Sequence, residues 1–173
     1  MIKSSLSALS FRKGYGMISM NNLFSYYVGE LNEFVSEALA GHGPFIKRVI
    51  SKVSASLVED LYSMGVVVDA SWKHTLDNSA VRHAMKTHGS SREELRGQIP
   101  ITKRDLLLIP YIVECYDLIR IEKNRRGQDV IIYSKAMNDG VTYYVEEVRL
   151  GRHELAASTL YKRKKENSPT LMD

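Results

Sequence analysis

The strongest constraint on the fold is the pattern of the last third of the chain. From Asp117 onward, four runs rich in β-branched and aromatic residues alternate with short gaps that contain Gly with Asn or a charged residue. The runs are DLIRIEK, DVIIYSKA, VTYYVEEVRL and ELAASTLYKRK, and the gaps are NRRGQ, MNDG and GRH. Strand-forming runs separated by such turns predict consecutive β-hairpins. We therefore expect a four-stranded antiparallel meander with one face packed against helices.

Helical patterns precede this expected sheet. Between residues 22 and 64, apolar side chains recur at three- and four-residue steps, which predicts two helices with one apolar stripe each. The stretch GHGP (41–44) separates them, and its proline is suited to open the second helix, which would end at Gly65. The expected product is an antiparallel helical hairpin that packs in the core or docks onto a partner or a second copy. Residues 66–68 (VVV) favour a short buried strand.

Two more helices are expected between the hairpin and the meander. Asp77 or Ser79 can cap a helix that ends near Gly89, a residue that tolerates left-handed backbone. Thr102 and Asp105 have the spacing of a capping box at the start of another helix. Helices first and a sheet last describe an α+β fold, here a helical hairpin followed by helices packed on a four-stranded antiparallel sheet.

The change of pattern at Gly65 predicts the division of the chain. We expect a helical part over residues 1–64, used for packing or partner docking, a second part over 65–166 and a flexible tail over 167–173. A length of 173 residues suffices for one domain with a proper core, or for a domain with an appendage.

Composition narrows the class of protein. With 44% hydrophobic and 25% charged residues, the chain is expected to be soluble and globular, and no apolar run approaches the roughly 20 residues that cross a bilayer. The first residues lack the compact apolar stretch of a signal peptide. The single cysteine, Cys115, excludes an internal disulfide and a multi-cysteine zinc site. A reducing, cytoplasmic setting without membrane binding fits these features best.

The charge is modestly basic. The formal net charge is +4, the sequence pI is about 9.1, and the densest cluster of cations is YKRKK at residues 161–165. Such a balance permits binding to phosphate backbones but does not require it, because a terminal run of Lys and Arg is commonly a solvated tail.

Three of the five histidines lie in HTLDNSAVRHAMKTHG, residues 74–89. Helical geometry places His88 at the foot of the apolar stripe, beside the C-terminal carbonyls, where an imidazole is favoured for structural reasons. His83 lies roughly 140° away on the polar side, so the two are poorly placed to hold one metal ion. An accessible His83 is a candidate for proton transfer, although an ordinary exposed histidine is the simpler explanation. His74 is expected in the connection before the helix, where catalytic residues often lie.

Polar residues share the strand faces with apolar ones in the expected meander. Alternation along VTYYVEEVR groups Tyr143, Val145, Glu147 and Arg149 on one face, and Tyr144, Glu146 and Val148 on the other. In the neighbouring runs, Thr159 and Tyr161 share a face with Leu155 and Ala157, and Tyr133 shares one with Ile131 and Lys135. Mixed faces of this kind favour a partly enclosed functional surface, but ordinary cross-strand pairing of Glu with Arg or Lys explains them equally well.

Several segments, in the same order, resemble one phage-associated subfamily of the barnase/EndoU/colicin/RelE-like (BECR) nucleases. They are HTLDNSAVRHAMKTHG, RGQIPITKRDLLLIPYIVECYDLI, DVIIYSKA and YYVEEVRLGRHELAASTLYKRK, so the resemblance spans about residues 72–164 and leaves the hairpin outside. The resemblance implies a metal-independent ribonuclease fold, without a cofactor, whose active site lies across the open face of the sheet. Proteins of this kind resemble toxin or effector modules of phages and mobile elements.

The resemblance also implies roles for individual residues. The expected reaction is attack of a ribose 2′-hydroxyl on the adjacent phosphorus, assisted by a base and an acid and by groups that steady the phosphate. His83 and His74 are the first choice for acid and base, with His88 as second choice and Glu146 or Glu147 as a replacement for one histidine. The full catalytic set is His83, His74, His88, Arg149, Thr159, Tyr133 and Glu147. The substrate-binding set is Lys73, Arg82, Lys135, Tyr161 and Lys162.

The expected partners follow from this resemblance. RNA is the expected substrate, with tRNA as one candidate among RNAs. An immunity or antitoxin protein is a candidate partner, and the N-terminal hairpin is a candidate for self-association. Two alternatives stay open. One is a non-catalytic RNA-binding or phage-assembly module on the same fold, and the other is a helical adaptor whose hairpin is the functional part.

Overall fold

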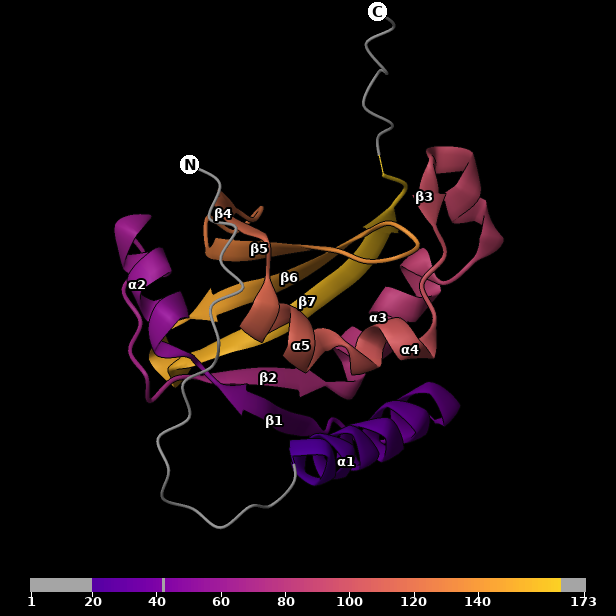
Figure 1. The fold of residues 1–173 in the computed structure, drawn as a ribbon, viewed down its shortest axis with the longest axis horizontal. Helices are drawn as coiled ribbons and strands as arrows, with labels where there is room; N and C mark the ends of the chain where they lie inside the picture. The colour runs from indigo at the N-terminus through magenta and orange to yellow at the C-terminus, as the bar shows by residue number, and fades with distance from the viewer. Residues whose placement is uncertain (1–19, 42, 166–173) are drawn as a thin grey trace, which may run out of the picture.

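The computed structural model describes residues 20–41 and 43–165, with side chains from residue 29 onward. The expected tail at 167–173, and the first part of the apolar stripe expected from residue 22, lie outside the described backbone or side chains. The described chain forms one mixed sheet with helices packed around it (Figure 1). The helices are α1 (Met20–Ala40), α2 (Ala55–Ser63), α3 (Asn78–His88), α4 (Lys103–Leu107) and α5 (Ile109–Cys115), with 3₁₀ helices η1 (Ser91–Arg96) and η2 (Leu150–Arg152). The strands are β1 (Lys47–Lys52), β2 (Lys73–Asp77), β3 (Gln98–Ile99), β4 (Leu118–Lys123), β5 (Asp129–Ala136), β6 (Val141–Arg149) and β7 (Glu154–Arg163).

The expected meander forms, but it is part of a larger sheet. Strands β4 to β7 pair antiparallel in sequence order. Strand β7 is ten residues long, and its second edge is shared by two more strands. Strand β2 pairs parallel with its first residues, and β3 pairs antiparallel with its last residues. The sheet therefore has seven strands, with β1 added outside β2, and the expectation of a four-stranded antiparallel sheet is wrong.

The N-terminal half is not a helical hairpin. The first expected helix is present as α1, but the segment expected as the second helix divides into strand β1 and helix α2. The β-branched residues of β1 suit a strand, and β2 offers the edge with which it pairs. Ser54 then caps α2, because its hydroxyl accepts a hydrogen bond from the amide of Leu57 at 3.2 Å. Residues 66–68 are a loop rather than a strand, although Val66 and Val68 are buried as expected.

Residues on both sides of Gly65 build one hydrophobic core. Val35 of α1, Leu57 of α2, Ile112 of α5 and Leu155 of β7 belong to the same cluster of buried side chains. Helix α3 packs against both α1 and β7. The N-terminal segments are therefore part of the scaffold that positions the rest of the sheet.

The two faces of the meander differ in what they carry. One face packs Tyr133, Tyr144 and Leu160 into the core under the helices. The opposite surface, which we call the open face, carries buried Val130, Ile132 and Ala156 that lie outside the core cluster. Strand register and alternation also place the following polar and aromatic residues on the open face: Arg120 and Glu122 on β4, Ser134 on β5, Tyr143, Glu147 and Arg149 on β6, Thr159, Tyr161 and Arg163 on β7, and Lys73 on β2.

Candidate active site

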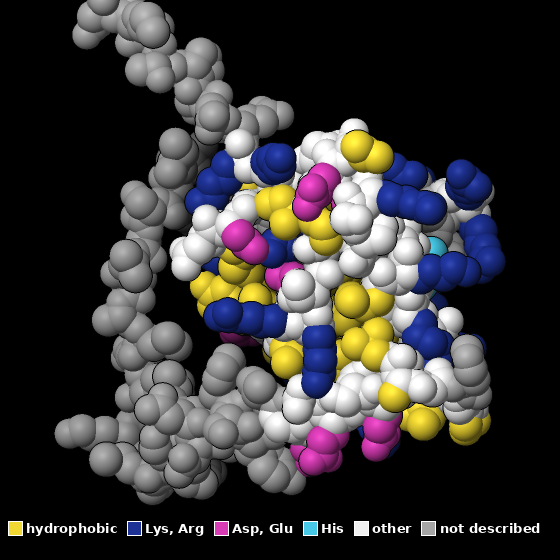
Figure 2. Space-filling view, turned by 90° about the vertical axis from the view of Figure 1, so that its right-hand side faces the viewer, with side chains coloured by type: hydrophobic (Ala, Val, Ile, Leu, Met, Phe, Trp, Pro, Cys, Tyr) yellow, Lys and Arg dark blue, Asp and Glu magenta, His cyan; other side chains and the backbone are white. Residues whose placement is uncertain are grey.

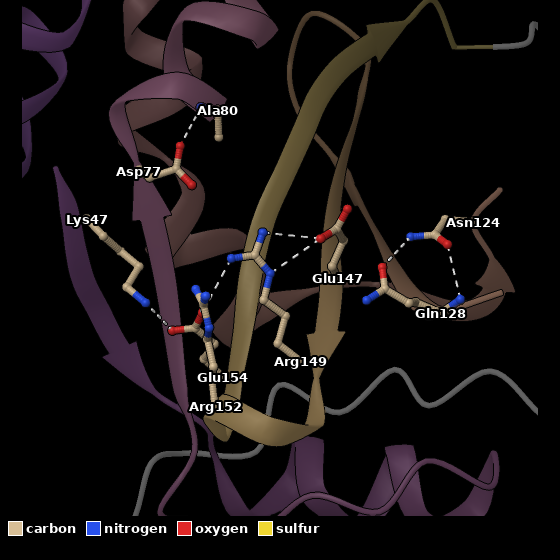
Figure 3. A network of polar contacts seen from close by, with 9 residues as sticks. All are labelled: Lys47, Asp77, Ala80, Asn124, Gln128, Glu147, Arg149, Arg152 and Glu154. Carbon is tan, nitrogen blue, oxygen red and sulfur yellow. Dashed lines mark hydrogen bonds and ion pairs between the residues drawn. The ribbon is translucent and has the colours of Figure 1, made fainter. Parts of the chain in front are cut away.

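Helix α3 begins as expected and ends differently. Asp77 caps it by accepting a hydrogen bond from the amide of Ala80 at 2.8 Å (Figure 3). At its end, Gly89 has φ −91° and is not left-handed, so the expected conformation is wrong. Glycine fits here for another reason, because a Cβ at this position would lie 2.5 Å from the carbonyl oxygen of Met85. The close turn leads into η1, which brings Glu93 back to the end of α3.

His88 is held by a buried carboxylate. Its Nδ1 lies 2.9 Å from Oε2 of Glu93, whose other oxygen accepts a hydrogen bond from Arg96 at 3.3 Å. Glu93 is 1% exposed, whereas the imidazole is partly accessible. When Nδ1–H donates to the carboxylate, Nε2 of the neutral ring is left as a proton acceptor. A histidine oriented in this way has the arrangement of a general base.

The ring of His88 continues a row of aromatic side chains on the open face. Its centroid lies 5.7 Å from that of Tyr161, which stacks on Tyr143 at 5.0 Å with 9° between the planes. The guanidinium of Arg163 lies 5.5 Å from the centroids of both tyrosines. Burial raises the pKa of Tyr161, although Arg163 and Arg120 oppose this shift, so its hydroxyl is a hydrogen-bond donor at neutral pH.

Lys and Arg side chains gather along one side of this end of the molecule. Figure 2 shows the end of the molecule that carries α3 and β3, with the Lys and Arg side chains gathered mainly along the right-hand side of the view. A surface of this charge attracts phosphate groups.

A second cluster of charges lies near the other end of β6. Arg149 donates to Glu147 at 3.2 and 3.4 Å and to Glu154 at 3.4 Å (Figure 3). The buried carboxylate of Glu154 also forms ion pairs with Lys47 at 2.6 Å and with Arg152 at 3.9 Å. The carboxylates therefore already neutralise much of the positive charge of this cluster.

The two clusters do not meet at one point. Tyr143 and Arg149 are six positions apart on β6, which corresponds to roughly 20 Å along a strand. Thr159 lies next to Tyr161 on the same strand face, but its Oγ1 is covered and has no hydrogen-bond partner among the described residues. Lys73 is exposed and lies beside Glu154, at the end of the sheet that carries Arg149. Of the expected site residues, His88, Thr159 and Tyr161 lie at one end of the open face, and Arg149, Glu147 and Lys73 lie at the other.

Three expected site residues lie in a buried polar cluster under the helices. His74 is 1% exposed, and its Nδ1 lies 2.9 and 3.0 Å from the two carboxylate oxygens of Glu146. The hydroxyls of Tyr133 and Tyr144 donate to the same carboxylate at 2.8 and 3.1 Å. The placement of His74 in a loop is wrong, because β2 joins β7 in parallel and sets His74 beside Leu155 in the core. Burial, followed by the charge of Glu146, raises the pKa of both tyrosines well above its usual range.

Two lysines that were expected to bind substrate form ion pairs away from the open face. Lys135 lies on the core side of β5 and pairs with Asp117 at 2.8 Å. Lys162 is buried and pairs with Asp105 at 3.0 Å and with Asp139. Both cations therefore stabilise the scaffold in this structure and do not lie on the open face.

The remaining expected residues lie on α3. Nη1 of Arg82 is 3.4 Å from the carbonyl oxygens of Ala38 and Gly41, so the side chain joins α3 to the end of α1. His83 is exposed, as helical geometry predicts, and it makes no hydrogen bond or ion pair with another described residue.

Glu93 and Arg163 had not been singled out from the sequence. Glu93 follows His88 by five residues across a glycine, a spacing that matches no regular element, and only the 3₁₀ turn makes it a partner. Arg163 belongs to the basic run 161–165, but only strand alternation separates it, on the open face, from the buried Lys162.

Two further features concern the described part of the chain. No group of three or more His, Cys, Asp or Glu side chains within it is arranged to hold a metal ion. None of the helices described is both long enough and apolar enough to cross a membrane.

Comparison with known families adds the decisive observation. A family model described as phage-Barnase-EndoU-ColicinE5/D-RelE like nuclease3 matches residues 48–168. The chain belongs to this family. The match begins in β1, so this BECR-like nuclease region contains the sheet except for Lys47, together with α2, and it is longer than the segment 72–164. Neither the curated proteins nor the solved structures give a match.

Proposed function

We propose that this BECR-like nuclease is an endoribonuclease of the phage toxin type, and that His88 is its general base. The observation that carries the proposal is the pair formed by His88 and the buried Glu93 at the edge of the open face. The family description supports a nuclease and names phages. The basic surroundings of the site support a nucleic-acid substrate.

The proposed reaction is cleavage by the ribose 2′-hydroxyl. Nε2 of His88 takes the proton from this hydroxyl, and its oxygen forms a bond to the adjacent phosphorus. The bond from phosphorus to the 5′-oxygen breaks, and water supplies the proton that the leaving oxygen needs. The products are a 2′,3′-cyclic phosphate and a 5′-hydroxyl, and His88 returns its proton to the solvent. The reaction uses no metal ion.

Groups beside His88 suit the charge that develops on the phosphate. Arg163 supplies a fixed positive charge next to Tyr161, and the Tyr161 hydroxyl donates a hydrogen bond without losing its proton. Arg149 is too far along β6 to contact the same phosphate. We therefore assign Arg149 and Glu147 no part in the bond-breaking step, in contrast to the roles implied by the family resemblance.

The substrate is RNA because DNA lacks the attacking hydroxyl. The test is incubation of the purified protein with a labelled RNA oligonucleotide in EDTA, beside DNA of the same sequence and an RNA with 2′-O-methyl groups throughout. We expect only the unmodified RNA to be cleaved, with cyclic phosphate ends that acid converts to monophosphates. Intact RNA, or cleavage of the DNA or of the 2′-O-methyl RNA, contradicts the proposal.

A further inference from the structure

The row of rings on the open face ends at Tyr143, whose side chain is partly exposed. Reading across the sheet, Tyr161 of β7 neighbours Tyr143 of β6, which neighbours Ser134 of β5 and then Leu118 of β4. One face of the Tyr143 ring stacks on Tyr161. On its other side the neighbouring side chain is a serine, which is too small to cover a ring. Leu118, two strands away, is 71% exposed.

The spacing of the strands leaves room for a planar group over Ser134. Neighbouring strands are about 4.8 Å apart, so Tyr143 and Leu118 stand roughly 10 Å apart across β5. Stacked bases in a nucleic acid repeat about every 3.4 Å, so a base in contact with both neighbours needs roughly 7 Å. A single nucleobase therefore fits between the ring of Tyr143 and the side chain of Leu118.

Cations lie on both sides of this position along the strands. Arg163 lies beside the two tyrosines on the side of the β7 C-terminus. Arg120 follows Leu118 by two residues on the same face of β4, on the other side. A stacked nucleotide has a phosphate on each side of its sugar. Arg163 faces one of them, and Arg120 can reach the other by exchanging its exposed ion pair with Glu122, which measures 3.1 Å.

We propose that Tyr143 stacks an unpaired nucleobase over Ser134, and that single-stranded RNA is the substrate class of this nuclease. A base within a duplex is stacked between its neighbours and has no free face for Tyr143. The tyrosine row then leads the strand from the stacked base toward His88. The inference that the bound strand is cut rests on the proposed function, whereas binding of the single strand does not.

The test measures binding without cleavage. The probe is a fluorescein-labelled, ten-nucleotide RNA with 2′-O-methyl groups throughout, which has no hydroxyl for the attack, and its affinity is followed by anisotropy. Base stacking on an aromatic side chain is worth about 1–3 kcal/mol, so Tyr143→Ala is expected to weaken binding roughly 5- to 140-fold. Tyr143→Phe is expected to bind like the wild type. Tyr62→Ala is the matched control, because Tyr62 lies on α2 and is 72% exposed.

A second variant blocks the site without removing the ring. Ser134→Phe places an aromatic side chain in the space beside Tyr143, and phenylalanine suits a strand. It is expected to weaken binding to a similar extent while the melting temperature stays near that of the wild type. The same probe annealed to its complement is expected to bind more weakly than the single strand.

The outcomes separate this inference from the proposed function. Wild-type affinity in Tyr143→Ala or Ser134→Phe, or equal affinity for duplex and single strand, overturns the stacking site whether or not RNA is cut. No measurable binding of the probe overturns it as well. Binding that depends on Tyr143 without any cleavage of unmodified RNA supports the stacking site and contradicts the nuclease mechanism.

Discussion

The carboxylate of Glu93 lies 2.9 Å from Nδ1 of His88, across the tight turn that follows α3. The glutamate is buried and the histidine is partly accessible. The pair therefore fixes the ring of the histidine that, among the described residues, lies beside the tyrosines of the open face. From the sequence, His88 ranked below His83 and His74 because its position at the end of a helix predicted a structural role, while the family resemblance kept it among the candidates.

Replacing Glu93 tests whether this orientation matters. Glu93→Gln keeps the shape but removes the charge that favours Nδ1–H, so Nε2 is no longer held as the acceptor. We expect kcat/KM for RNA to fall by between about tenfold and 10⁴-fold. The larger decrease corresponds to loss of the whole contribution of His88 as general base. Glu94→Gln, one residue further and exposed, is the control and is expected to be unchanged. Unchanged kinetics in a folded Glu93→Gln protein would show that the carboxylate has only a structural part.

The buried cluster around Glu146 predicts an effect on stability. His74→Ala removes the ring that lies 2.9 Å from this carboxylate and leaves a buried charge without that partner. We expect the free energy of unfolding to fall by about 3–5 kcal/mol, measured by denaturant titration. His83→Ala, on the exposed side of α3, is expected to change it by less than about 0.5 kcal/mol. Similar stabilities for the two variants would contradict the burial of His74.

The pair formed by Lys162 and Asp139 predicts a dependence on pH. The hydrogen bond from Lys162 lowers the pKa of Asp139 below its usual value of 3.8, although partial burial opposes the shift. A carboxyl group with a lowered pKa stabilises the fold above its unfolded pKa, and this contribution is lost as the pH falls through the folded pKa. Asp139→Asn is therefore expected to lower the melting temperature at pH 7 by more than at pH 3. The contribution is small, because Asp139 is mostly exposed. An equal difference in melting temperature between the variant and the wild type at both pH values would contradict a lowered pKa of Asp139.

Local patterns predicted the elements whose partners are close in sequence. The meander was predictable because each of its strands pairs with the next across a short turn. Helix α3 was predictable from its cap and its periodicity. The capping box of Thr102 and Asp105 is also present, since a carboxylate oxygen of Asp105 accepts from the Thr102 amide at 2.7 Å.

Elements with distant partners were not predictable in this way. Strand β2 forms by pairing with the second edge of β7, and β1 forms by pairing with β2. The local sequence at residues 47–52 and 73–77 does not indicate that this edge of β7 is available. The same pairing buries His74 in the sheet, whereas a loop would have left it exposed. Alternation correctly separated the two faces of β6, but it could not say that the face with Glu146 is the buried one.

The two histidines of α3 allow the central claim to be tested within one helix. His88→Ala and His83→Ala make the same chemical change five residues apart, so cleavage of a single-stranded RNA by the two variants and the wild type, in EDTA at neutral pH, is the most direct measurement. We predict that His88→Ala lowers the single-turnover rate constant by roughly 10²–10⁴-fold and that His83→Ala leaves it within about twofold. Wild-type cleavage by a folded His88→Ala protein, or a loss confined to His83→Ala, would contradict the account.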